Sequence, residues 1–82
     1  MPHGSPSYTL NGAELVRRRE NAGWSQRELA AKCKAAGRAV DASQIARYET
    51  GQSTPRPAAL TVMAEVLKCE PDDLAIRTAV VA

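Results

Sequence analysis

Residues 40–51 read VDASQIARYETG and carry the signals for both ends of one short helix. Asp41 is a residue type that caps helix starts, and Gln44 three positions later can reach back to the cap backbone. Gly51 is the residue type that most often ends a helix in the left-handed conformation. The stretch therefore predicts a helix over residues 42–50.

The same start signal occurs twice more upstream. Asn11 is followed three positions later by Glu14, and Ser25 by Glu28. Apolar residues flank each signal, as in a hydrophobic staple that fixes how the chain enters the helix. Each cap contributes about 1 kcal/mol. Three such starts in succession predict short helices of the kind from which small DNA-reading domains are built.

The whole chain reads as helical, without strand-like alternation. The spacing of apolar residues and the positions of glycine and proline set the bounds of five helices. These predicted helices cover residues 12–22, 26–36, 42–50 and 57–67, with a fifth that begins at Pro71. Phenylalanine is absent, so we expect an aliphatic, alanine-rich core in which Ile45 and Tyr48 face inward.

Length and composition exclude several classes of protein. A chain of 82 residues forms one small domain, and no apolar stretch approaches the ~20 residues that cross a membrane. Cys33 and Cys69 stand apart from other metal ligands, and the one histidine is His3 near the start. A zinc site needs about four ligands at characteristic spacing. We therefore expect no metal, no cofactor, no membrane contact and two core thiols in a reduced cytosolic protein.

Catalysis is also not indicated. The sequence shows no pairing of a nucleophile with a base and no phosphate-binding loop. The net charge is only +2, but it is unevenly distributed. Residues 1–56 hold nine basic and five acidic residues, whereas residues 57–82 hold two and four. A basic part beside an acidic part favours a domain with one polyanion-facing side.

Two stretches carry a family resemblance. They are LVRRRENAGWSQRELAAKC, residues 15–33, and VDASQIARYETGQSTPRPAALTVMAEVLKCEPDDL, residues 40–74. Together they resemble the Xre family of helix-turn-helix proteins, which has the fold of Cro and the lambdoid phage repressors. The matching positions are Arg19, Ser25, Gln26, Leu29, Ala30, Ile45, Tyr48, Glu49, Gly51, Pro55, Ala64, Leu67 and Leu74.

The resemblance implies an all-α, five-helix, lambda-repressor-like domain. We expect this helix-turn-helix domain over residues 10–78, a disordered leader over 1–9 and an apolar tail over 79–82. Two features depart from the family pattern. The connection between the second and third helices is longer by about five residues, which we divide between an extended helix and the turn at Gly37. Arg18 stands where the family usually has an aliphatic residue.

By resemblance, the helix over 42–50 is the recognition helix and enters the major groove. The expected base-reading residues are Ala42, Ser43, Gln44 and Arg47. Arg47 can bind guanine O6 and N7 through two hydrogen bonds, which is the commonest specific contact. Gln44 can read adenine, or it can be used in its capping box.

The resemblance also implies contacts that hold the DNA backbone. The expected phosphate-binding residues are Gln26, Arg27, Arg38, Thr50, Ser53, Thr54 and Arg56. Free N–H groups and the positive end of a helix favour an anion at Gln26. Arg19 and Glu49 are expected to form a buried structural ion pair between the first helix and the recognition helix.

The sequence thus predicts a DNA-binding transcriptional regulator of the phage or bacterial repressor type. We expect a homodimer, formed through the fifth helix and the tail, on a double-stranded palindromic operator. It would act in the bacterial cytoplasm, at the nucleoid or in a phage-infected host. The alternative is a protein-interaction module of the same fold, such as an antitoxin or a transcriptional bridging factor, which the modest net charge slightly favours.

Overall fold

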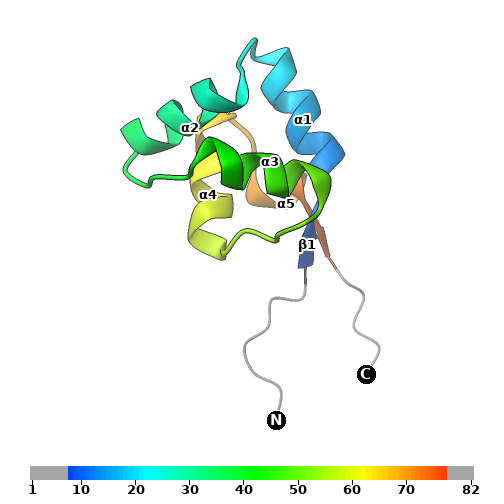
Figure 1. Ribbon diagram of the computed structural model, residues 1–82. Coiled ribbons are helices and arrows are strands. Elements are labelled where there is room, and N and C mark those ends of the chain that lie inside the picture. Colours follow the sequence, from blue (N-terminus) through cyan, green and yellow to red (C-terminus); the bar gives the residue numbers. More distant parts are fainter. Residues whose placement is uncertain (1–7, 78–82) are drawn as a thin grey trace, which may run out of the picture.

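A computed structural model describes residues 8–77 of the chain. The elements run in the order β1 (Tyr8–Leu10), α1 (Gly12–Asn21), α2 (Gln26–Ala35), α3 (Ala42–Thr50), α4 (Pro57–Val66), α5 (Pro71–Leu74) and β2 (Ala75–Arg77). The five helices form one cluster, and the two strands leave it side by side at one end (Figure 1). Within the described residues, no helix is long and apolar enough to cross a membrane.

The expected arrangement of five helices is confirmed, and the bounds of α3 are those predicted. Helices α1, α2 and α4 each end one residue earlier than predicted. In each case the next residue is the C-cap, whose N–H still donates to a carbonyl of the helix. The sequence pattern therefore does not separate the last helical residue from the cap.

Capping boxes set the starts of α2, α3 and α5. The Ser25 hydroxyl accepts from the Glu28 N–H at 3.0 Å, and the Glu28 carboxylate accepts from the Ser25 N–H at 2.7 Å. The Asn11 side chain accepts from the Glu14 N–H at 3.1 Å. Glu14 itself accepts from Arg17 and Arg18, and hydrogen bonding to Arg17 is the main reason why its pKa is lowered.

The position of Arg18 explains how the domain tolerates a charge where the family has an aliphatic residue. Its Nε donates to a Glu14 carboxylate oxygen at 2.7 Å, and 29% of its side chain stays exposed. Arg18 therefore lies at the edge of the core rather than within it. At this partly exposed site the ion pair adds little stability, but it gives the guanidinium a partner without burying it fully.

The core lies where all the longer helices meet. Its fully buried members include Leu15, Leu29, Cys33, Ile45, Met63 and Leu74. Tyr48 is also buried, as expected for the inward face of α3. Burial raises the pKa of the Cys33 thiol to about 11, which keeps it neutral. Cys69 is half-buried and also free, so it packs at the margin of the core.

The longer connection between α2 and α3 covers residues 36–41 and is well anchored. Gly37 has a φ of 109°, a left-handed conformation that glycine adopts without strain. The Arg38 N–H donates to the Cys33 carbonyl at 3.1 Å, and Val40 is buried, with only 3% of the residue exposed. The extra residues are therefore held at both ends, and the Arg38 side chain leaves the backbone at a fixed point.

The prediction of a chain without strands is wrong. β1 and β2 pair antiparallel in the register Tyr8↔Arg77, Thr9↔Ile76 and Leu10↔Ala75. Each strand has three residues, too few for an alternating pattern, and the pairing joins the two ends of the domain. Tyr8 and Thr9, assigned to the leader, therefore belong to a sheet. The rest of that leader and the tail over 79–82 lie outside the described residues.

The fifth helix begins at Pro71, as predicted, and has only four residues. α5 ends at Leu74, and the chain continues directly into β2. The Leu74 carbonyl accepts from the Asn11 N–H at 2.7 Å, which starts the pairing of the two chain ends. Ile76 lies in β2.

Candidate nucleic-acid interface

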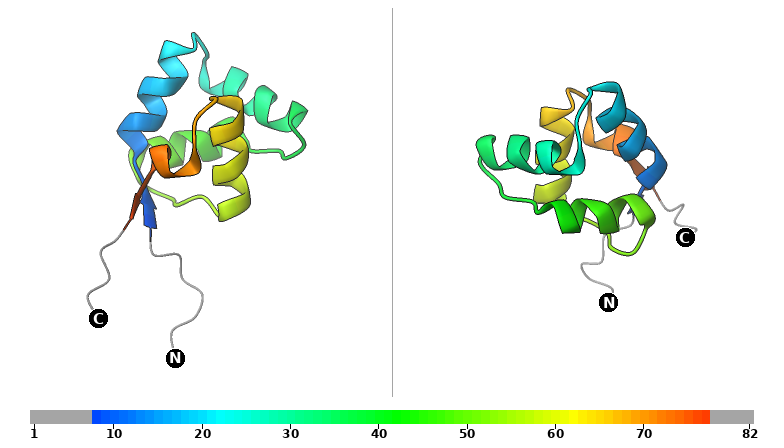
Figure 2. Two further views of the ribbon diagram at one scale, coloured as in Figure 1. Left: turned by 180° about the vertical axis from the view of Figure 1, so that it is seen from behind. Right: turned by 45° about the horizontal axis from the view of Figure 1, so that its top comes forward.

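Helix α3 presents one face to the core and the other to solvent. It packs against both α1 and α2, as two views of the ribbon also show (Figure 2). Its buried residues are Ile45 and Tyr48. Ser43 and Arg47 are exposed and Ala42 is half-buried, so these three expected base-reading residues lie away from the core face.

Gln44 is used in its capping box. Its Oε1 accepts from the Asp41 N–H at 3.0 Å. Bidentate recognition of adenine needs both the oxygen and the nitrogen of the amide. Of the two roles that the sequence left open, the structure therefore shows the cap, which leaves the Gln44 Nε2 hydrogens without a partner.

Four arginines around α3 have neither an ion pair nor a side-chain hydrogen bond within the described part of the chain. They are Arg27, Arg38, Arg47 and Arg56, and all four are exposed. By contrast, Arg17, Arg18 and Arg19 of α1 are each paired with a carboxylate. The positive charge that remains free to meet a polyanion is thus on the α2–α4 side.

A polar network ties the end of α3 to the first two helices. Arg19 Nε and Nη2 donate to the two Glu49 carboxylate oxygens at 2.6 Å and 3.2 Å. Gln26 Nε2 donates to the same carboxylate at 2.8 Å, and Arg19 Nη1 donates to the Trp24 carbonyl at 2.8 Å. The bonds to Glu49 raise the pKa of Arg19. Only 11% of the Arg19 side chain and 6% of the Glu49 side chain are exposed.

Two of the expected phosphate ligands use hydrogens within the protein. Gln26 donates one to Glu49, as above, and keeps a second N–H. The Thr50 hydroxyl hydrogen lies toward the Ala46 and Arg47 carbonyls, each 3.2 Å from Oγ1. Thr50 must therefore rotate its hydroxyl before it can donate to a phosphate.

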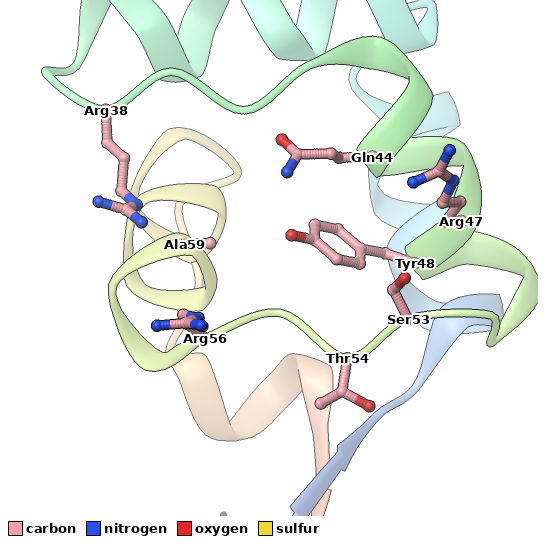
Figure 3. A pocket seen from close by; sticks show the side chains of 8 residues that line it. All are labelled: Arg38, Gln44, Arg47, Tyr48, Ser53, Thr54, Arg56 and Ala59. Atoms are coloured by element: carbon pink, nitrogen blue, oxygen red, sulfur yellow. The ribbon is translucent and has the colours of Figure 1, made fainter.

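Six of the expected site residues gather around one pocket of about 270 Å³. The pocket lies between α3, the longer connection and the start of α4 (Figure 3). Its expected members are Arg38, Gln44, Arg47, Ser53, Thr54 and Arg56, and Tyr48 and Ala59 complete the lining. Gln26, Arg27, Ala42, Ser43 and Thr50 do not line it.

Two tyrosine hydroxyls were not anticipated from the sequence. The Tyr48 hydroxyl points into the pocket, although the ring belongs to the core (Figure 3). The Tyr8 hydroxyl donates to the Pro55 carbonyl at 2.8 Å and so holds the α3–α4 loop from β1. Burial raises the pKa of Tyr8. A tyrosine on the inward face of a helix usually keeps its hydroxyl at a polar boundary, so the position of Tyr48 could have been anticipated. No nearby residue in the sequence indicates the contact of Tyr8 with Pro55.

Comparison with known proteins agrees with this geometry. A family model described as a helix-turn-helix domain matches residues 12–75. The crystal structure of the P22 c2 repressor protein in complex with synthetic operator 9T, in the presence of Tl⁺, is similar with a TM-score of 0.68. The similarity covers 78% of this chain and 89% of that chain at 23% sequence identity, so it concerns the fold. A comparison with curated protein sequences returns no match.

Proposed function

This chain belongs to the helix-turn-helix domain family, and on that premise we propose that it is a sequence-specific regulator of transcription of the repressor type. The observation that carries the proposal is the division of α3. Ile45 and Tyr48 are buried, while the opposite face presents Arg47 without any partner in the described structure. A guanidinium that the protein itself does not use is free to meet a base edge.

In the proposed complex, α3 lies in the major groove and its exposed face reads the bases. Arg47 binds a guanine, Ser43 donates to or accepts from a neighbouring base, and Ala42 packs on a thymine methyl. Gln44 contributes through its free Nε2, because the cap holds its oxygen. The repressor-like fold found with operator DNA in the P22 c2 protein supports this placement.

The backbone contacts follow from the unpaired charges and small polar side chains around α3. The proposed phosphate ligands are Gln26, Arg27, Arg38, Thr50, Ser53, Thr54 and Arg56. Such contacts fix the register on the duplex without reading sequence. Arg27 and Gln26 lie in the first turn of α2, where free N–H groups and the helix dipole also favour an anion.

Two copies would bind a palindromic operator, with half-sites about 10 bp apart. The proposed dimer contact is the end of the domain that contains α5, β2 and the tail. Ile76 supports it, because it is 51% exposed and is the large apolar residue left exposed among those described. Doubling the interface supplies affinity that a domain with so few base contacts lacks. A protein that acts on DNA in this way would work in the bacterial cytoplasm.

Replacing Arg47 by alanine is expected to weaken binding to the cognate operator by about 1–3 kcal/mol, with a much smaller effect on random DNA. The matched variant is Arg56→Ala, which removes an arginine that is also exposed and is proposed to contact phosphate. It should weaken both duplexes alike. Fluorescence anisotropy at one fixed salt concentration measures both effects. Equal losses on the two duplexes for Arg47→Ala would remove that residue from base reading.

A further inference from the structure

The pocket between α3 and α4 has a charge that the protein does not balance. Three of its lining residues are arginines, Arg38, Arg47 and Arg56, and none is acidic. No carboxylate within residues 8–77 pairs with any of these three. Like charges around one concavity repel each other, and an anion between them would relieve that repulsion.

Two neutral donors are aimed into the same space. The Tyr48 ring is held in the core, with 8% of the residue exposed, and its hydroxyl has no hydrogen-bond partner in the described part of the chain. The Gln44 oxygen is held by the Asp41 N–H, so its amide nitrogen points inward. In Figure 3 these two groups extend from α3 toward Arg38 and Arg56 on the opposite wall.

The start of α4 forms another part of the lining. Arg56 is its N-cap, without a side-chain cap, and Ala59 of the first turn lines the pocket. Helix α4 has ten residues, and the positive end of its dipole adds to the field of the arginines. Arg38 reaches this place because the longer connection holds its backbone against α2. Donors thus converge from the connection, from α3 and from α4.

We propose that the DNA-free protein binds the terminal phosphate of a small phosphorylated molecule, or inorganic phosphate, in this pocket. A terminal phosphate carries about two negative charges and three free oxygens at neutral pH. A backbone phosphate of DNA carries one charge and two free oxygens, and it must lead a chain out on both sides. Donors arranged on facing walls suit the first ligand better.

Occupation of the pocket would regulate the protein. Arg38 and Arg56 bind the small ligand here, and they are also proposed to hold DNA phosphates. The two ligands therefore compete, and a rise in the phosphorylated molecule releases the DNA. This competition rests on the proposed function, whereas binding of the phosphate to the free protein does not.

The test is an NMR titration of the DNA-free protein, once with methyl phosphate and once with dimethyl phosphate. The ionic strength is held constant and the pH is about 8, where the monoester is a dianion. We expect methyl phosphate to saturate and to shift the Gln44 amide and Tyr48 ring signals. Dimethyl phosphate, which imitates the DNA backbone, should bind about tenfold more weakly. Equal affinity for the two would mean that the pocket holds DNA backbone and would overturn the small-molecule proposal.

Three variants test whether methyl phosphate binds in this pocket. Arg38→Ala and Tyr48→Phe should each weaken methyl phosphate about tenfold, and the second removes only a hydroxyl from a ring that stays packed. Lys68→Gln removes one positive charge just beyond the far end of α4 and should change nothing. Circular dichroism checks that each variant folds. A weak, unsaturable response that is the same in all four proteins would overturn the proposal.

The last arm adds methyl phosphate to the protein bound to its operator. Release of DNA from the parent protein, but not from Arg38→Ala, is the expected result. DNA binding without any methyl phosphate binding would refute the pocket and leave the proposed function standing. Phosphate binding without DNA binding would refute the proposed function and leave the pocket standing.

Discussion

Replacing Glu49 by alanine is expected to lower the free energy of unfolding by about 3–5 kcal/mol. The Glu49 carboxylate accepts from Arg19 and from Gln26, and its side chain is only 6% exposed. Its removal leaves the Arg19 guanidinium partly buried and with one remaining bond, to the Trp24 carbonyl. An unpaired buried charge costs far more than the net value of the pair.

Urea unfolding followed by circular dichroism measures this loss. The double variant Arg19→Met, Glu49→Leu should be less destabilised than Glu49→Ala alone, because no charge is then left unpaired. Glu14→Ala is the matched control, since Glu14 forms ion pairs with the exposed Arg17 and the partly exposed Arg18 of α1, and its loss should change stability little. A Glu49→Ala protein as stable as the Glu14→Ala protein would show that the network does not hold α3.

Replacing Gly12 by alanine is expected to cost about 3 kcal/mol, at the upper end of overpacking effects. A Cβ at Gly12 would overlap the Glu49 carbonyl oxygen. It would also lie 2.9 Å from the Glu49 carbonyl carbon and 3.0 Å from the Tyr48 backbone carbonyl oxygen. All three are backbone atoms, so no side chain can move aside. The first turn of α1 would have to separate from the last turn of α3.

The expected loss of stability is opposite in direction to the usual effect of replacing glycine by alanine in a helix, which makes the test decisive. Glycine in a helix usually costs about 0.5–1 kcal/mol relative to alanine, so the same change normally stabilises. The reverse substitution at the neighbouring exposed position, Ala13→Gly, is the control and should cost only that small amount. Thermal unfolding of the two variants gives the comparison. A Gly12→Ala protein that is more stable than the parent would mean that α1 and α3 do not approach so closely.

The elements that the sequence predicted well are those whose signals are local. The start of α3 depends on Asp41 and Gln44, three residues apart, and its end depends on Gly51, which has a φ of 83°. Caps and left-handed glycines act within one turn of the chain. Short-range spacing therefore predicts both bounds of α3.

What the sequence did not predict depends on residues far apart in the chain. The pairing of Tyr8 with Arg77 joins the two ends of the domain, and no local pattern marks either strand. The close approach at Gly12 likewise exists only because α1 crosses the end of α3. The family resemblance supplied the candidate site residues one by one, but the pocket that six of them share arises from the packing of α4 beside the longer connection.

The most direct measurement is a selection of bound duplexes from a random DNA library at physiological salt, sequenced after several rounds. We expect an enriched palindrome with a guanine in each half and a half-site spacing of about 10 bp. Two copies of the domain, each binding one guanine through Arg47, would select such a sequence. The opposite result is no enrichment by a folded, helical protein. That outcome would contradict sequence-specific DNA recognition and favour a protein-interaction module, such as an antitoxin or a transcriptional bridging factor, on the same fold.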